Sequence, residues 1–437
     1  MASGTADKPY EINSAQDLKR LADDVNAGND FAGKFFVLTA DIELSEEWTP
    51  IGYFNSRDDK KPFNGTFDGQ NHTISNLTID NPSVGSQGLF GFVGENGTIK
   101  NLNLSNVNIS GYWFVGGLVG YNGGTVENCT VNNATVSGYE YSGYEYSGDE
   151  DSDDEGIGDE DIGGLVGVNV GTVENCKVSN ATVSGNENVG GLVGVNDDGK
   201  VENCTVSDAT VSGNCWIGGL VGVNHDGKVE NCTVSGATVS GDRFVGGLVG
   251  GNGGTVENCT VNNATVSGDN CVGGLVGFNI GTTVTDCTVC NTEISGNSEI
   301  GGLVGCNSVD DTVENCTVSN ATVSGNKIIG GLVGHNGGTV KNCTVSDATV
   351  SGNDCVGGLV GYNGGTVKNC TVNNATVSGD NCVGGLVGFN EDGTVENCTV
   401  SDTTVSGNCW IGGLVGSNED GTVENCTVNN ATVNGKS

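Results

Sequence analysis

Cysteine is the most reactive residue type in this chain, and it recurs at a regular position. The chain has 18 cysteines, and eleven of them follow an Asn or Asp and precede a Thr or Lys. Eleven is odd, so these cannot all pair with one another. If copies stack about 4.8 Å apart, they also exceed the mean Cβ separation of about 3.8 Å in a disulfide. We therefore interpret this cysteine column as small buried side chains, beginning with Cys129, Cys176 and Cys204.

A second group of cysteines lies just before Gly-Gly pairs. Cys271, Cys355 and Cys382 each stand two residues before such a pair. Cys355 and Cys382 come from consecutive copies, on a segment where the chain can adjust, so we predict a Cys355–Cys382 disulfide. A structural zinc site is not indicated, because Cys287 and Cys290 form the only Cys-x-x-Cys pair and zinc sites of this kind need a second pair.

Acidic residues dominate the charge of the chain. The formal net charge is -38, which argues against nucleic acid as a partner, because that needs clustered Lys and Arg. Residues 139–161 form an acidic insertion that should loop out. There, four carboxylates partly match the spacing of a calcium-binding EF-hand, although Asp154 stands where Gly is required. Calcium therefore stays open as a ligand, with no other cofactor indicated, and its candidate ligands are Asp149, Asp151, Asp153 and Glu160.

The four residues before each Gly-Gly pair vary strongly while the rest of the repeat is nearly constant. Trp, Arg and Phe, which often anchor interfaces, are concentrated there. A second variable loop, which also varies in length, follows the next Asn. We expect these two loop edges to carry any ligand contacts, and the candidate ligand-binding residues are Trp113, Trp216, Arg243, Phe244 and Trp410.

The cysteine columns and the variable residues sit in one repeating unit. The string Gly-Gly-Leu-Val-Gly occurs eleven times, and after a first step of 47 residues the copies start 27 to 29 residues apart. Each unit holds short runs of Val, Thr and Ile closed by Asn or Gly, which is typical of strands and not of helices. The sequence therefore predicts an all-β fold, a right-handed parallel β-solenoid (β-helix) of about eleven coils.

Stacking turns every repeat position into a column. An unbroken Asn column follows the Gly-Leu-Val-Gly segment and begins with Asn122, Asn169 and Asn196. Asn tolerates left-handed turns, and its amide can bond to the copy above, so we expect a ladder of side-chain amides. Asn-Cys-Thr and Asn-Ala-Thr are also glycosylation acceptors, which leaves that alternative open.

The chain divides into three parts. Residues 1–8 are expected to be flexible. Residues 9–114 should form an N-terminal capping region with irregular β coils and one short helix, in which Ser14 is the N-cap and Leu18, Leu21 and Val25 share one face. Residues 115–437 form the repeat solenoid. Neither a signal peptide nor a membrane-inserting segment is evident, and the C-terminus shows no cap, so self-association at that end is an expectation.

The repeats resemble the GLUG motif of bacterial surface proteins. Residues 10–18, 48–52, 65–69 and 97–102 are similar to the stretch that leads into such repeats. The resemblance implies a secreted or wall-attached, adhesin-like protein. Some relatives carry an IgA-specific metallopeptidase domain, but this chain has no His-Glu-x-x-His, and its only histidines are His72, His225 and His335.

We therefore expect a non-enzymatic protein of the cell surface or extracellular space that acts as a structural shaft or adhesin. Its partner would be a glycan or protein of a host or neighbouring cell. A calcium- or ice-binding repeat array and a filament-forming unit are alternatives. A carbohydrate-active enzyme is another, for which Asp41, Asp68 and His72 are carboxylate and base candidates, although each stands in a string typical of the family's structure.

Overall fold

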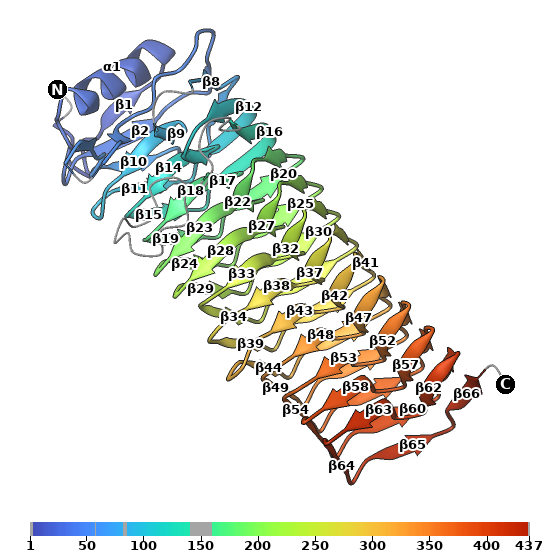
Figure 1. The fold of residues 1–437 in the computed structure, drawn as a ribbon. Coiled ribbons are helices and arrows are strands. Elements are labelled where there is room, and N and C mark those ends of the chain that lie inside the picture. The colour runs from blue at the N-terminus through green and yellow to red at the C-terminus, as the bar shows by residue number, and fades with distance from the viewer. Residues whose placement is uncertain (1–2, 57, 82–84, 140–159, 436–437) are drawn as a thin grey trace.

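The chain folds into one long parallel β-solenoid (Figure 1). This computed structural model describes residues 3–56, 58–81, 85–139 and 160–435. Among these residues, no helix has the length and apolar character needed to cross a membrane. The all-β solenoid predicted from the repeats is confirmed.

One coil illustrates the whole shaft. It consists of β27 (Cys215–Gly218), β28 (Val221–His225), β29 (Lys228–Glu230), β30 (Thr233–Ser235) and β31 (Thr238–Ser240). Each strand pairs in parallel with its counterpart in the next coil, for example Val221 with Val249 and Val229 with Val256. Because pairing is in register, every repeat position stacks on itself along the shaft.

The solenoid begins earlier than the perfect repeats. Strands β1 (Tyr10–Ile12), β2 (Phe35–Leu38), β6 (Thr66–Asp68) and β11 (Thr98–Lys100) are the first members of a 15-stranded parallel sheet that ends at β64 (Thr422–Glu424). The count of about eleven coils was therefore too low. The early coils escape a search for repeats because the buried Val position is filled by other apolar residues, namely Phe36, Phe67 and Ile99, which stack on Val126.

Helix α1 (Ala15–Asn26) lies at the first end of the shaft (Figure 1). Its N-cap is Ser14, whose hydroxyl accepts a hydrogen bond from the Asp17 N–H. Leu18, Leu21 and Val25 are buried in the same core as the strands. The helix thus covers apolar surface that a first coil would otherwise expose.

Candidate binding face

Two neighbouring columns carry nearly all of the large variable side chains. The pre-glycine column is the residue two positions before each Gly-Gly pair. The pre-asparagine column is the residue just before the unbroken Asn column, where Gly251, Phe278, Cys306 and His335 stack in register. A residue of the first column packs on the second column of the following coil, as a Cβ on Gly251 would meet the Trp216 ring at 2.4 Å. We call these two columns, together with the residue just before each member of the pre-glycine column, the variable face.

The pre-glycine column has an unusual backbone. Its residues have a left-handed φ, between 46° and 62°, in nine consecutive coils. These are Asn188, Trp216, Phe244, Cys271, Glu299, Ile328, Cys355, Cys382 and Trp410.

This conformation costs about 1–2 kcal/mol for a residue with a Cβ, and Gly, Asn and Asp adopt it most readily. The other left-handed columns follow that preference, as at Asn231, Asp286 and Gly236. Four of the nine pre-glycine residues are instead bulky apolar ones, namely Trp216, Phe244, Ile328 and Trp410. Large side chains thus occupy an unfavourable backbone conformation in several coils, which indicates a role for those side chains at the surface.

The structure brings three of the predicted contact residues together. The rings of Trp216 and Phe244 stack with centroids 4.1 Å apart, and the Arg243 guanidinium lies 4.9 Å from the Phe244 ring centroid. Phe278, from the pre-asparagine column, continues the stack at 5.2 Å from Phe244. Trp216, Phe244 and Phe278 are half-buried, whereas Arg243 is exposed. We call these four residues the aromatic patch.

The remaining two predicted contact residues lie elsewhere. Trp113 is half-buried against Tyr112, at a ring distance of 5.6 Å, and covers Gly85. Trp410 belongs to the pre-glycine column but lies several coils beyond the aromatic patch, with 66% of its surface exposed. They do not form a common site with Trp216.

Sequence reasoning missed the pre-asparagine column. Its members Phe278, Tyr362 and Phe389 follow an invariant Gly-Leu-Val-Gly run, so they read as the end of a conserved strand. The available signal was their variability between two constant residues, Gly and Asn. Only the solenoid geometry shows that this position faces the same side as the residues before Gly-Gly.

A second aromatic stack lies farther along the variable face. His335 stacks on Tyr362 with ring centroids 4.9 Å apart, and Phe389 contacts Tyr362 edge-on at 5.7 Å. The Tyr362 hydroxyl donates to the Glu391 carboxylate. Burial lowers the pKa of His335, and nearby Glu299 opposes this only in part.

The lowered pKa of His335 makes the stability of the protein depend on pH. Because the folded protein binds the His335 proton less readily than the unfolded chain, its contribution is complete above the usual pKa of about 6.5 and is lost as the pH falls through the lowered value. We expect wild type to lose more thermal stability between pH about 7.5 and about 5 than His335→Phe does. Melting curves across this range test it, and parallel curves for the two proteins would contradict it.

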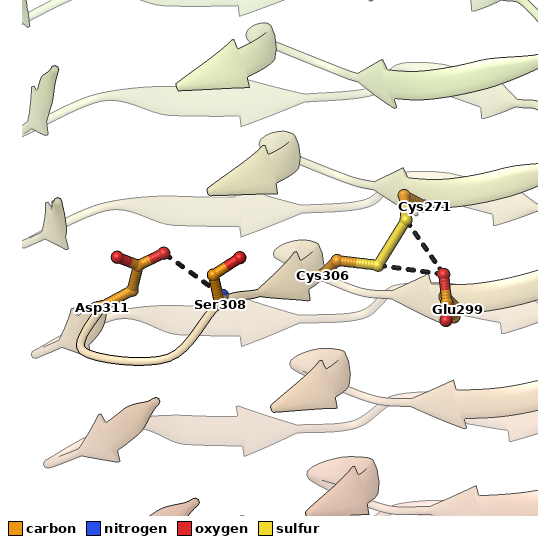
Figure 2. Close-up of a disulfide and its surroundings, with 5 residues drawn as sticks. All are labelled: Cys271, Glu299, Cys306, Ser308 and Asp311. Atoms are coloured by element: carbon orange, nitrogen blue, oxygen red, sulfur yellow. Dashed lines mark hydrogen bonds between the residues drawn. A yellow bond between two sulfur atoms is a disulfide. The ribbon is translucent and has the colours of Figure 1, made fainter. Parts of the chain in front are cut away.

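The disulfide differs from the one that we predicted. Cys355 and Cys382 are free thiols, and the disulfide joins Cys271 to Cys306, with Cα atoms 5.4 Å apart (Figure 2). Cys355 and Cys382 stack in register within one ladder, so their side chains run parallel. Cys271 in β37 (Asn270–Gly273) and Cys306 in β43 (Val304–Asn307) belong to different ladders of adjacent coils, and their side chains converge.

One carboxylate lies beside this disulfide, and another lies in the neighbouring turn. Glu299 Oε2 lies 3.0 Å from Cys271 Sγ and 3.1 Å from Cys306 Sγ. In the longer turn of residues 308–311, the buried Asp311 accepts hydrogen bonds from the Thr282 N–H at 2.8 Å and the Ser308 N–H at 3.2 Å (Figure 2). Burial raises the pKa of Asp311. This carboxylate therefore closes the turn and is not available to a ligand.

The Asn column forms a continuous ladder inside the shaft. Asn122 Nδ2 donates to Asn169 Oδ1 at 2.8 Å, and Asn169 Nδ2 donates to Asn196 Oδ1 at 2.7 Å. These side chains are fully buried. Each amide thus satisfies the next, which explains a polar column within an apolar core.

The cysteine column is also buried. Each thiol donates to a main-chain carbonyl two residues earlier, as Cys129 Sγ does to Glu127 O at 3.3 Å, and most also accept the N–H of the previous copy, as Cys204 Sγ does from Cys176. Burial raises the pKa of Cys176 and Cys204. Cys176 and Cys204 are therefore protonated and packed, which fits a structural role.

The other candidate residues are engaged in turns or lie outside the described residues. Asp149, Asp151 and Asp153 are outside them, while Glu160 is buried and accepts the Asn186 N–H at 2.7 Å. Asp41 accepts the Thr73 N–H at 2.9 Å and contacts His72 Nδ1 at 3.1 Å. Asp68 accepts from Asn101 Nδ2 at 3.0 Å and from the Gln70 N–H. Glu160, Asp41 and Asp68 thus each accept a hydrogen bond from the following coil.

Comparison with known proteins fits this architecture. The family model of the GLUG motif matches residues 111–137, 158–184, 185–212, 213–240, 245–267, 268–293, 296–324, 325–351, 352–378, 379–406 and 407–434. The chain belongs to the GLUG-motif repeat proteins.

A curated relative and several solved structures are similar to parts of this GLUG-repeat chain. Halomucin of Haloquadratum walsbyi is 34% identical over 136 residues, which cover 29% of this chain and 1% of halomucin. A putative immunoglobulin A1 protease from Bacteroides ovatus is 21% identical, with a TM-score of 0.39 over 73% of this chain and 77% of that structure. The A-module of an Azotobacter vinelandii mannuronan C-5 epimerase is 11% identical, with a TM-score of 0.26 over 100% of this chain and 93% of that one. At these identities the structural likeness concerns the fold alone.

Proposed function

We propose that this GLUG-repeat chain is a non-enzymatic extracellular or cell-surface protein. In this proposal a stiff shaft presents the variable face to a glycan or protein of a host or neighbouring cell. The observation that carries the proposal is the left-handed pre-glycine column, where bulky Trp, Phe and Ile side chains occupy four of nine positions that the backbone would favour for Asn or Gly.

The aromatic patch is the part of the variable face that we assign to the contact. Its rings stack on one another, so the faces between neighbouring rings are covered and the ring edges remain open to contact. Arg243 adds an exposed positive group on a chain whose net charge is -38. Ring edges beside one guanidinium suit a partner with apolar ridges and an acidic or hydroxyl-rich group.

The structural roles of the candidate carboxylates support a non-enzymatic protein. Hydrolysis of glycosides needs two carboxylates that face a substrate groove. Asp41 and Asp68, the candidates that we could group from sequence, each close a turn between coils. Two glutamates of the repeats form ion pairs instead, as Lys228 binds Glu230 at 2.8 Å and Lys341 binds Glu314 at 2.9 Å.

A binding array with the intact chain tests the proposal. The informative variant is Trp216→Asn with Phe244→Asn, because Asn188 already occupies the same column with the same backbone. This change removes the aromatic surface, fits the left-handed backbone, and should preserve the fold. We expect binding to any glycan or protein that the wild type captures to fall at least about tenfold, since buried aromatic anchors contribute about 2 kcal/mol or more.

The matched control is Ile328→Asn, which makes the same kind of change in the same column outside the aromatic patch. It should leave that binding unchanged. Equal loss in the control, or no loss in the double variant, would move the contact away from the aromatic patch. No captured glycan or protein for the intact chain would contradict the proposed binding role.

A further inference from the structure

A group of soft and hard metal ligands lies on the variable face outside the aromatic patch. Asp354, Cys355 and Cys382 each offer one ligand atom, and these three atoms all lie within 4.8 Å of one another. Asp354 and Cys355 belong to β52 (Asp354–Gly357), and Cys382 belongs to β57 (Asn381–Gly384) of the next coil. We propose that these three residues bind a thiophilic divalent cation such as Zn²⁺.

The parallel stacking keeps the two sulfurs available. Asp354 pairs with Asn381 and Val356 with Val383, so Cys355 lies directly over Cys382. In-register side chains stand about 4.8 Å apart, beyond the mean Cβ separation of about 3.8 Å in a disulfide. An oxidising medium that joins Cys271 to Cys306 therefore leaves Cys355 and Cys382 as thiols.

The left-handed backbone at both cysteines helps to form the site. Cys355 has φ 51° and Cys382 has φ 48°, in the same column that elsewhere places Trp216 and Phe244 at the surface. Cys382 is buried, while Asp354 and Cys355 are half-buried. The site is thus shielded on one side by the shaft and reachable by an ion on the other.

The donor set suits zinc and not calcium. Two sulfurs and one carboxylate oxygen are ligands of tetrahedral Zn²⁺, whose fourth position can be filled by water. Calcium and magnesium prefer oxygen ligands alone. As each metal–sulfur bond forms, the thiol gives up its proton to solvent, so the ion is held by two thiolates and a carboxylate.

The strand ladders place further polar side chains next to the site. In the backbone ladder, Lys327 of the preceding coil lies in register with Asp354. Cys409 of the following coil lies in register with Asn381. Tyr362, which donates to the Glu391 carboxylate, lies on the adjoining column. The similar group of Cys271, Glu299 and Cys306 is closed by its disulfide, so we expect one such ion among the residues that the structure describes.

Titration of the full chain with Zn²⁺ or Co²⁺, purified without reductant, tests the proposal. Wild type should bind one ion, and Co²⁺ should give the visible absorption of a tetrahedral thiolate site. Cys355→Ser with Cys382→Ser should lose about 100-fold or more in affinity, since even outer partners of a metal ligand contribute about 10–100-fold. Asp354→Asn should weaken binding with little risk to the fold, because Asn381 stands in the same ladder.

The matched control is Cys215→Ser. Cys215 is a half-buried free thiol in an equivalent strand and belongs to neither cysteine–carboxylate group. It should bind Co²⁺ like wild type. Unchanged Co²⁺ binding in the double Ser variant would overturn the proposal, as would a Cys355–Cys382 disulfide found by mass mapping of the untreated protein.

Discussion

Replacing Gly246 by Ala is expected to destabilise the protein by about 3 kcal/mol or more. A Cβ at this position would lie 1.9 Å from the carbonyl oxygen of Val249 and 2.8 Å from that of Leu275 in the next coil. Both neighbours are main-chain atoms of ladders that cannot shift without breaking hydrogen bonds. Thermal and urea unfolding, followed by circular dichroism, measure the effect.

Gly253→Ala is the matched control for this change. Its Cβ would meet Asn224 O at 3.5 Å, an ordinary contact, and its backbone is not left-handed. We expect a change within about 0.5 kcal/mol. If both substitutions cost the same, steric exclusion is not the reason for glycine in the Gly-Gly-Leu-Val-Gly string.

Replacing Asn224 by Asp is expected to cost about 3–5 kcal/mol at neutral pH. Asn224 is fully buried, accepts from Asn196 Nδ2 at 2.7 Å and donates to Asn252 Oδ1 at 2.9 Å. A carboxylate keeps the first bond but turns the second into contact between two acceptors, and it adds an unpaired charge inside the shaft.

The cost of Asn224→Asp should shrink as the pH falls. Once the introduced carboxyl is protonated, it can again donate to Asn252 Oδ1, so stability is regained as the proton is taken up. Asn231→Asp is the control, since it makes the same chemical change in an exposed column where Asp286 stands naturally. Unfolding at neutral and acidic pH compares the two, and equal costs would show that the ladder does not depend on its amide protons.

Prediction from sequence worked best where a residue's role depends on its own repeat. Val126 and Leu118 face the core, Asn122 forms a ladder and Cys129 is buried, because every copy meets an identical copy above and below. In such a stack, the neighbours of a residue in the adjacent coils are its own repeat equivalents, so the repeat pattern already indicates its surroundings. The early coils could not be predicted in this way, because Phe36 and Phe67 replace the repeating Val.

The candidate site was only partly predictable for the same reason. Trp216, Arg243 and Phe244 could be found as variable residues at the ends of strands, whereas Phe278 and Cys306 belong to another ladder and to the next coil. The sequence offset between Cys271 and Cys306 is 35 residues, which matches no repeat length. Cys271 and Cys306 come together because of the path that the chain takes around the shaft.

The repeats are enough to predict the solenoid, the stacking of each column and the buried Asn, Cys and Val positions, because a periodic chain can bury its apolar residues only by repeating one coil. Which different columns touch is visible only in the folded chain. The tertiary structure made the pre-glycine and pre-asparagine columns one face, joined Cys271 to Cys306, and left Cys355 and Cys382 as parallel thiols beside Asp354. The physical reason is that contacts within a column depend on repeat spacing, whereas contacts between columns depend on backbone angles and side-chain direction.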